Sequence, residues 1–421
     1  MSDTRTRDVI VVGGGPAGAT TAALLAREGH DVLLLERETF PRFRIGESLM
    51  PATYHTFKRL GVLDKLEAGG FVRKEAVRFY PPSGRAGAPF FFDEVEPPAS
   101  AATWQVDRGR FDSLLLEHAV EQGVQVMQPC SVVDLLQDGD QVCGVVATDQ
   151  EGERREIQAR VVVDASGQNA LISRRLRLRK VDDRLQHMAY FTRYKGAHLD
   201  EGRNAGATLI LHTREGDSWF WFIPLPGGVT SVGVVGHIDY LLKGRAGDPQ
   251  RVFDEEKALC PALGERLTIA LQTEPVQVLK DFSYISQRLA GDGWVMVGDA
   301  FGFLDPIYSS GVFLALKSAE FAADSIHASL AEGDLSAAAL GRHGAEYVAG
   351  MEALRRLIYA YYDREFSFGR FLKAHPDCRD DLVNLLVGNV YRRDCKRFLA
   401  ALDTNSRPEG YEPLRLSESD R

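Results

Sequence analysis

The chain has 421 residues, of which 44% are hydrophobic and 26% are charged. At about 150 residues per domain, this length predicts two or three domains, and the composition excludes wholesale disorder and low-complexity repeats. The net charge of −9 disfavours nucleic acid as a partner.

No apolar run reaches the roughly 18 residues that a membrane-spanning helix needs, so a membrane is not an expected partner either. No apolar segment of a secretory signal precedes the first predicted strand, which favours a cytoplasmic location. The five cysteines are scattered and form no CxxC pair. We therefore expect neither a disulfide framework nor a metal site.

The chain begins with a predicted βαβ unit. Asp8–Val12 is a short run rich in β-branched residues, which is typical of a buried strand. Pro16–Glu28 carries alanines and leucines at helical spacing, and Asp31–Glu36 predicts a second strand. Together they have the length of about 30 residues that such a unit requires.

A G-x-G-x-x-G motif joins the first strand to the helix at Gly13, Gly15 and Gly18. The first glycine permits a tight turn, the second lets the backbone approach a pyrophosphate, and the third allows close packing of helix on sheet. Pro16 and Ala17 open the helix, whose free N–H groups and dipole favour phosphates. Glu36, at the end of the next strand, can accept hydrogen bonds from ribose hydroxyls. The alternative is a glycine-rich turn followed by an accidental acid.

The remaining elements follow in chain order. Residues 41–75 are predicted to form a loop and helices, and Phe111–Glu121 to form an amphipathic helix. Strands are predicted at Val124–Met127, Gln141–Thr148, Arg155–Ala165, Met188–Tyr194, Ala207–His212, Trp219–Pro224, Thr230–Gly236 and Trp294–Gly298. The four strands between residues 188 and 236 indicate a second, antiparallel sheet. A helix is predicted from Gly311 to Ala331, followed by a mostly helical region and a frayed polar tail, Asn405–Arg421.

A single dinucleotide fingerprint favours FAD, because an enzyme with separate FAD and nicotinamide units would show two. A flavin needs further segments along its length, and Val162–Gly167 and Gly298–Ala300 each end a strand in small residues. The carboxylate of Asp299 can bind ribityl hydroxyls there. We therefore predict an α/β fold with three parts. A discontinuous Rossmann-type FAD-binding domain takes residues 1–75, 105–180 and 280–335. An antiparallel-sheet domain for the substrate takes residues 76–104 and 181–279, and a helical C-terminal region takes residues 336–421.

The order of motifs GGGPAG, RxGES, DASG and GDA resembles the FAD-dependent monooxygenase-like superfamily. This superfamily includes aromatic hydroxylases, geranylgeranyl reductases and flavin-dependent halogenases. The resemblance implies the FAD fold of the aromatic hydroxylases. It also implies flavin contacts from Arg44, Glu47 and Ser48 of the RxGES segment. Arg108 resembles a flavin-contacting arginine, and its alternative is a solvated loop charge.

Three features resemble flavin-dependent halogenases in particular. Residues 219–224 match W-x-W-x-I-P, in which Trp219 and Trp221 are implied to keep substrate from the flavin. Residues 303–311 match F-x-x-P-x-x-S-x-G, which implies cofactor contacts from Pro306 and Gly311 and a halide site at Ser310 and Gly311. Lys74 lies where the family carries its catalytic lysine. The alternatives are an aromatic pair on one strand face, a serine helix cap and a solvated lysine.

The resemblance implies a complete cycle. FADH2 from a separate flavin reductase forms a C4a-hydroperoxide with oxygen, and chloride or bromide converts it to hypohalous acid. Lys74 relays the halogen to an electron-rich aromatic ring. Tyr308 stands where free-tryptophan halogenases carry a glutamate, so the implied substrate is a phenol or a pyrrole, either free or tethered to a carrier protein. An aromatic hydroxylase, a geranylgeranyl-reductase-like enzyme and a flavin-binding protein without turnover are the alternatives.

Overall fold

The computed structural model describes residues 5–245, 248–280 and 283–416. Its first sheet has the order β19-β20-β10-β1-β2-β7, and neighbouring strands along it are parallel except for β19 and β20. The strands of this sheet are β1 (Arg7–Val12), β2 (Val32–Leu35), β7 (Gln125–Met127), β10 (Arg154–Asp164), β19 (Ala290–Gly291) and β20 (Trp294–Met296). The predicted βαβ unit is confirmed, with β1 beside β2 and helix α1 (Pro16–Arg27) between them.

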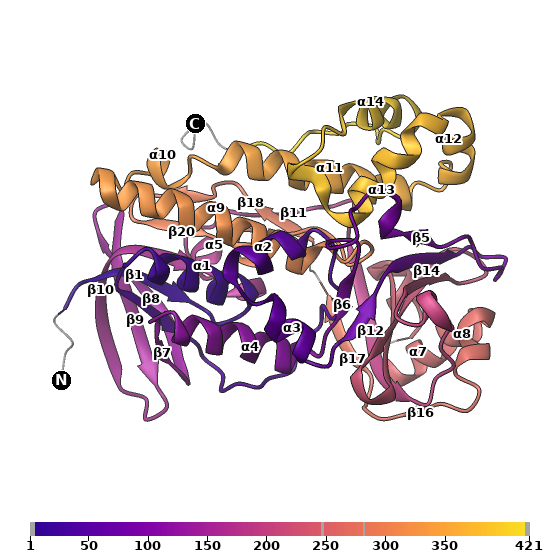
Figure 1. Cartoon of the computed structure of the whole chain (residues 1–421), viewed down its shortest axis with the longest axis horizontal. Coiled ribbons are helices and arrows are strands. Elements are labelled where there is room, and N and C mark those ends of the chain that lie inside the picture. The colour runs from indigo at the N-terminus through magenta and orange to yellow at the C-terminus, as the bar shows by residue number, and fades with distance from the viewer. Residues whose placement is uncertain (1–4, 246–247, 281–282, 417–421) are drawn as a thin grey trace.

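Both faces of the first sheet are buried, which explains its continuous apolar strands. Val9 and Val11 of β1 face a core that includes α1, α4 (Arg108–Glu121) and α9 (Ser310–Glu332), and Ile10 and Val12 face the core on the other side. Helix α1 packs against both α4 and α9, and Figure 1 shows these helices across one face of the sheet. The predicted helices at 111–121 and 311–331 are confirmed.

Strand β10 continues beyond the first sheet into an antiparallel extension with β8 (Cys130–Asp138) and β9 (Gln141–Asp149). We did not predict β8. Its register shifts twice, at Val132/Asp134 and at Leu136/Gln137, and these irregularities interrupt the alternation of apolar and polar residues that identifies a strand.

The second sheet has the order β16-β12-β15-β14-β13-β4-β5, with β17 also paired to β12. The four predicted strands, β12 to β15, pair antiparallel with one another, as expected. The parallel pair in this sheet is β13 with β4, which was not among the four. Its strands are β4 (Ala76–Tyr80), β5 (Phe90–Phe91), β12 (His187–Lys195), β13 (Thr208–His212), β14 (Ser218–Leu225), β15 (Val229–His237), β16 (Leu271–Gln272) and β17 (Gln277–Lys280).

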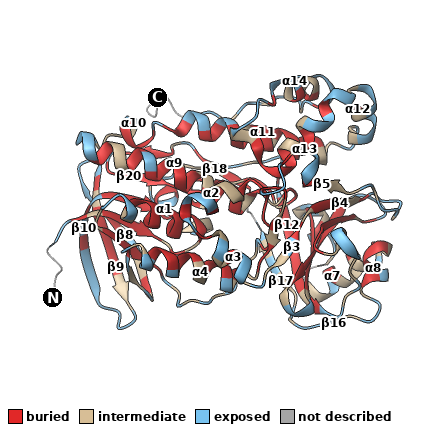
Figure 2. Cartoon of the chain, viewed as in Figure 1, coloured by how far each residue is buried: buried red, intermediate tan, exposed pale blue. Residues whose placement is uncertain are grey.

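The two faces of the second sheet pack against different partners. Phe220 and Phe222 of β14 face a core that includes α7 (Pro249–Ala258) and α8 (Pro261–Arg266), with α6 (Ile238–Leu242) beside them. Trp219 and Trp221 point to the opposite face, into the main core, as the two-residue period of a strand requires. Figure 2 shows buried residues along β12 and the neighbouring strands.

Short elements connect the two sheets. The two-stranded sheet of β3 and β6 and the three-stranded sheet of β11, β18 and β21 contain few residues each. Their bounds, with those of the adjoining helices, are α2 (Thr53–Leu60), α3 (Leu63–Ala68), β3 (Val72–Lys74), β6 (Thr103–Gln105), α5 (Leu171–Arg175), β11 (Arg179–Val181), β18 (Tyr284–Ser286) and β21 (Gly302–Phe303).

The C-terminal region is helical, as predicted, and lies along the top of the molecule in Figure 1. Its helices are α10 (Ala337–Leu340), α11 (Gly344–Tyr362), α12 (Phe368–Ala374), α13 (Arg379–Val387) and α14 (Lys396–Asn405). Beyond α14, the ring of Tyr411 packs on that of Tyr359, and the Leu414 N–H donates to Glu352. Tyr411 and Leu414 of the expected tail therefore contact α11, and residues 417–421 lie outside the described residues.

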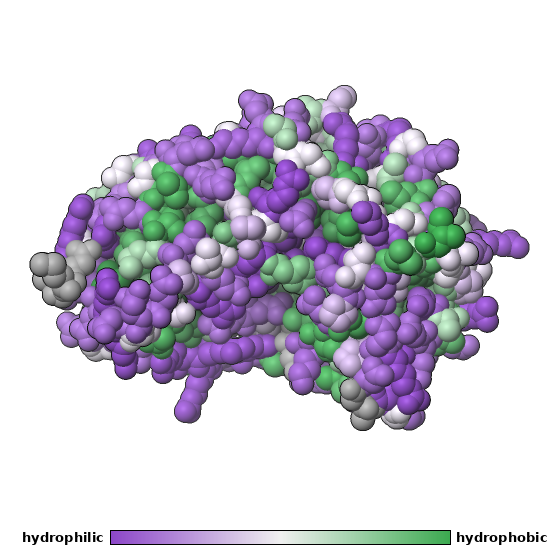
Figure 3. All heavy atoms as spheres, turned by 90° about the horizontal axis from the view of Figure 1, so that it is seen from below, coloured by the Kyte–Doolittle hydropathy of each residue, from purple (hydrophilic) through white to green (hydrophobic). Residues whose placement is uncertain are grey.

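Within the described ranges, no helix combines the length and the apolar composition that crossing a bilayer requires. Figure 3 shows a face on which hydrophilic residues predominate, with smaller hydrophobic areas between them. The boundaries of the three domains stay a prediction.

Candidate active site

A cavity of about 590 Å³ lies between the two sheets, at the carboxyl ends of β1, β2 and β10. This is where open α/β sheets bind ligands. Most of the residues that the sequence singled out line this cavity: Gly13, Gly15, Pro16, Ala17, Glu36, Arg44, Glu47, Ser48, Arg108, Trp221, Asp299, Pro306 and Gly311. Gly18, Lys74, Trp219 and Ser310 are not on its wall.

The glycine-rich loop is shaped in a way that only glycine allows. Gly13 has a φ of +107°, and a Cβ atom there would lie 2.4 Å from the carbonyl oxygen of Ala165. A Cβ on Gly18 would lie 1.9 Å from the carbonyl oxygen of Gly13. Because both positions exclude a side chain, the loop stays close to the sheet and the first N–H groups of α1 face the cavity.

Glu36 lies at the end of β2 with 4% of its surface exposed. Its carboxylate accepts hydrogen bonds from the backbone N–H groups of Gly14 (2.7 Å) and Glu38 (2.9 Å). These bonds hold the carboxylate beside the glycine-rich loop, and its remaining lone pairs are available to ribose hydroxyls.

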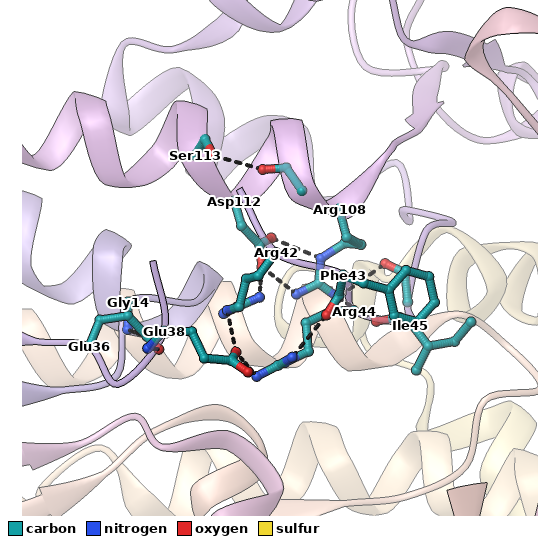
Figure 4. Close-up of polar contacts among 12 residues, drawn as sticks. Gly14, Glu36, Glu38, Arg42, Phe43, Arg44, Ile45, Arg108, Asp112 and Ser113 are labelled. Atoms are coloured by element: carbon teal, nitrogen blue, oxygen red, sulfur yellow. Dashed lines mark hydrogen bonds and ion pairs between the residues drawn. The ribbon is translucent and has the colours of Figure 1, made fainter. Parts of the chain in front are cut away.

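Charged residues cluster on the other side of the loop (Figure 4). The buried carboxylate of Asp112 accepts from Arg42 (2.9 Å) and in two bonds from Arg108 (2.8 and 3.0 Å). Arg108 also donates to the carbonyl oxygen of Ile45, so it is a buried anchor and the alternative of a solvated charge is wrong. Arg44 is partly exposed and pairs with Glu38.

Sequence reasoning missed Arg42, which lies two residues before the RxGES segment. A Cβ on Gly15 would be 3.4 Å from its guanidinium, so this cation faces the loop at which a pyrophosphate is expected. Nothing in the sequence indicated this proximity, because α1 and β2 separate Arg42 from the glycine-rich loop in the chain.

These residues fit FAD. The loop accepts no side chain, positive groups face it, and a carboxylate lies at the ribose position. Asp299, in the wall near Arg108, is partly buried, and desolvation raises its pKa to about 6. When it is bound, FAD brings the redox chemistry of its flavin ring to this cavity. Among the described residues, no group of three or more His, Cys, Asp or Glu side chains is arranged to hold a metal ion.

Lys74 ends β3 and is buried, with 4% of its surface exposed. Its Nζ donates to Ser48 Oγ (2.8 Å) and to the carbonyl oxygen of Leu49 (2.9 Å). Burial lowers the pKa of Lys74 to about 7, since desolvation penalises the ammonium form. The lysine therefore lies behind the cavity wall, one hydrogen bond from it, and the solvated alternative is wrong.

The two tryptophans of β14 differ in position. Trp221 lines the cavity and donates to Ser231 Oγ (3.1 Å). Trp219 lies behind the wall and donates to the hydroxyl of Tyr362 (3.0 Å) at the end of α11. That hydroxyl donates to the buried carboxylate of Asp305 (3.1 Å), so the W-x-W-x-I-P strand is tied to the loop that carries the F-x-x-P-x-x-S-x-G motif.

The F-x-x-P-x-x-S-x-G loop leads into α9. Pro306, Ser309 and Gly311 line the cavity, whereas Ser310 is buried at the first residue of the helix. Asp305 accepts a further hydrogen bond from the Ile307 N–H (3.0 Å), and its carboxylate lies 3.2 Å from His187 Nδ1. Sequence reasoning missed Asp305, His187 and Tyr362 as a group, because they are far apart in the chain.

Residues 6–339 match the family described as FAD binding domain. A 1H-pyrrole-2-carbonyl peptidyl-carrier-protein brominase of Pseudoalteromonas luteoviolacea is 31% identical over 418 residues, which cover 99% of this chain and 100% of that protein. The chain belongs to the flavin-dependent halogenase family.

Two further comparisons describe this halogenase's relatives. A 1H-pyrrole-2-carbonyl peptidyl-carrier-protein chlorinase of Pseudomonas fluorescens is 32% identical over 407 residues, 91% of this chain and 89% of the relative. The solved structure of the flavin-dependent brominase Bmp2 has a TM-score of 0.86 and 32% identity, and the alignment covers 95% of this chain and 98% of that one. The predicted FAD fold and halogenase activity are confirmed.

Proposed function

We propose that this halogenase transfers chlorine or bromine to a pyrrole or a phenol, with a carrier-bound pyrrole as the first candidate. Two relatives named for pyrrole-2-carbonyl carrier proteins, one a brominase and one a chlorinase, align with about nine-tenths or more of the chain. These relatives support a carrier-bound pyrrole as the substrate. Because one is named a brominase and the other a chlorinase, the experiment tests both bromide and chloride.

The observation that carries the proposal is Lys74. A lysine that is buried, with a pKa lowered to about 7, is in part an uncharged amine at neutral pH. An amine is a nucleophile toward the halogen of hypohalous acid, and an ammonium is not. Reduced FAD with oxygen and halide supplies that oxidant. Lys74 then takes up the halogen and presents it to the aromatic ring.

The cavity wall has a separate role. Trp221 stacks at a tilt against Phe191, with ring centroids 6.0 Å apart, and both line the cavity. This aromatic wall fills space that a substrate would need in order to reach the flavin. The ring to be halogenated is therefore kept away from the flavin, and the halogen moves to it through Lys74.

The halide site of the proposal is the start of α9. Gly311 lies on the cavity wall, where its backbone N–H and the positive end of the helix dipole favour an anion. Ser310 takes part through its backbone N–H. A separate flavin reductase and a cytoplasmic location complete the proposal, and the sequence alone supports them.

The proposal is tested with product mass spectra. Reduced FAD, oxygen and either chloride or bromide are supplied with pyrrole-2-carbonyl carrier protein, free pyrrole-2-carboxylate or a phenol. We expect a halogen isotope pattern that requires halide and is strongest for one carrier-bound or phenolic substrate. Oxygen insertion that is independent of halide would contradict the proposal and favour the hydroxylase.

A further inference from the structure

Two hydroxyl groups lie between the cavity and Lys74. Ser48 Oγ accepts from Lys74 Nζ at 2.8 Å and lies 2.8 Å from Thr208 Oγ1. Both Ser48 and Thr208 are on the cavity wall, whereas Lys74 is behind it. In the described part of the chain, these two hydroxyls are thus the polar connection between the cavity and the amine.

The side chain of Gln105 sets the direction of the hydrogen bonds. Its Nε2 donates to the carbonyl oxygen of Gly206 (3.0 Å) and to Thr208 Oγ1 (2.9 Å). A carbonyl oxygen can only accept, so the amide nitrogen must face this side, and Thr208 Oγ1 must accept from it.

The protons of the pair can now be counted. Ser48 Oγ accepts from Lys74 and Thr208 Oγ1 accepts from Gln105. The two hydroxyls carry one proton each, and one of these forms the bond between them. With Lys74 as the donor to Ser48, the other proton has no acceptor among the described residues, and both Ser48 and Thr208 line the cavity. One O–H group is therefore left to donate into the cavity.

The surroundings of Lys74 match its uncharged form. A neutral amine has two N–H groups, and Ser48 and the carbonyl oxygen of Leu49 accept both. No acidic side chain of the described residues pairs with Lys74 Nζ. The lone pair of the amine is left without a donor and is available to a halogen.

We propose that Ser48 and Thr208 form a two-hydroxyl proton relay that serves halogen transfer to Lys74. This inference rests on the proposed halogenase function. The free O–H donates to the oxygen of hypohalous acid in the cavity. The Lys74 nitrogen attacks the halogen, so that an N–halogen bond forms and the oxygen–halogen bond breaks.

The relay balances this step. The departing hydroxide takes a proton from the hydroxyl pair and leaves as water, and the pair regains a proton from the Lys74 N–H through Ser48 Oγ. The halogen keeps its oxidation state, and the products are one N-halogenated lysine and one water. Thr208 reaches Lys74 only through Ser48, so removing its hydroxyl shortens the relay without removing a hydrogen bond of the amine.

The test uses Thr208→Val, which removes the hydroxyl at nearly constant shape, and Thr208→Ser, which restores it. The matched control is Thr103→Val. Thr103 is also buried and lies opposite Lys74 in the β3–β6 pair, but its hydroxyl has no hydrogen-bond partner among the described residues.

Each protein, saturated with oxidised FAD, is mixed with hypochlorous acid, and chlorine on the Lys74 peptide is followed by mass spectrometry in H2O and in D2O. This bypasses the flavin chemistry. We expect Thr208→Val to slow the chlorination of Lys74 at least about tenfold and to lose the solvent isotope effect. Thr208→Ser and Thr103→Val should remain close to the parent protein.

Two results would overturn the relay: Thr208→Val as fast as the parent, or Thr208→Val and Thr103→Val slowed alike. A parent protein that halogenates its substrate with reduced FAD but gains no chlorine on Lys74 would also overturn it, and would leave the halogenase function standing. A further result is also informative. If the Lys74 chlorination rates of the variants are as expected, but the reduced enzyme halogenates no substrate tested, the relay is supported and the proposed substrate class is contradicted.

Discussion

The flavin end of the cavity and the Lys74 end use opposite electrostatics. At the flavin end, Arg42 and Arg108 share the fully buried carboxylate of Asp112, which keeps both guanidiniums charged and fixed beside the phosphate loop. At the other end, Lys74 has hydroxyl and carbonyl partners and an aromatic neighbour, Phe92, 5.5 Å from its Nζ. A carboxylate stabilises a cation, and burial without one destabilises it.

This difference explains how one cavity serves two purposes. A pyrophosphate needs permanent positive charge, which arginine provides at any physiological pH. A nucleophilic amine must lose its proton, and a lysine in an apolar site does so near neutral pH. The comparison teaches that the type of a basic residue and its partners together decide whether it binds an anion or attacks an electrophile: arginine stays charged, and a buried lysine without a carboxylate partner does not.

The largest expected effect comes from removing the amine. Lys74→Ala should lower halogenation by at least about a hundredfold and leave flavin binding unchanged, because Lys74 is behind the cavity wall. Product formation and flavin titration measure the two quantities. Arg73→Ala is the control, since Arg73 is exposed and, among the described residues, its ion pair is with Glu75 at the surface. A fully active Lys74→Ala protein would contradict the role of Lys74 as the nucleophile at its end of the cavity.

A single added methyl group in the glycine-rich loop should disrupt FAD binding at the flavin end. Gly18→Ala should weaken FAD binding at least about tenfold and lower the free energy of unfolding by about 2 kcal/mol, since its Cβ would collide with the Gly13 carbonyl oxygen. Gly264→Ala, in helix α8 where a Cβ meets nothing within 4 Å, should leave FAD binding unchanged and raise the free energy of unfolding by up to about 1 kcal/mol, because alanine forms helix better than glycine. Flavin titration and denaturant unfolding provide the measurements. Normal FAD affinity in Gly18→Ala would contradict the assignment of this loop to the FAD pyrophosphate.

The pH dependence of halogenation tests whether the uncharged amine of Lys74 is the reactive form. Burial lowers the pKa of Lys74 to about 7, so the reactive amine is lost as pH falls through that value. The single-turnover rate should drop about tenfold between pH 8 and pH 6. Because burial also raises the pKa of Asp299 to about 6, FAD affinity is measured at each pH. A rate that is flat from pH 6 to 8 at saturating FAD would refute an amine nucleophile.

The smallest expected effect concerns the hydrogen bonds that join the W-x-W-x-I-P strand to the F-x-x-P-x-x-S-x-G loop. Tyr362→Phe removes the hydroxyl that joins Trp219 to the Asp305 carboxylate and should lower the free energy of unfolding by about 2 kcal/mol. Tyr361→Phe loses a bond to the uncharged His212 and should lose about 1 kcal/mol. Denaturant unfolding compares them. Equal losses would show that the carboxylate partner adds nothing.

The sequence by itself determined the flavin end. The strand, the glycine-rich turn, the helix and Glu36 are contiguous, and their spacing depends on local geometry and on glycine's lack of a Cβ. The same local rules located β14 and showed that Trp219 and Trp221 share one face. They failed at β8, where register shifts disrupt the pattern.

Only the tertiary structure decided the Lys74 end. Residues 48, 74, 105 and 208 come from different elements, and no spacing in the chain relates them. The proximity of Asp305, His187 and Tyr362 is likewise a result of packing between the second sheet and α11. Burial and hydrogen-bond partners set the charge of Lys74, and these are properties of the folded environment that a residue's type and position in the chain do not contain.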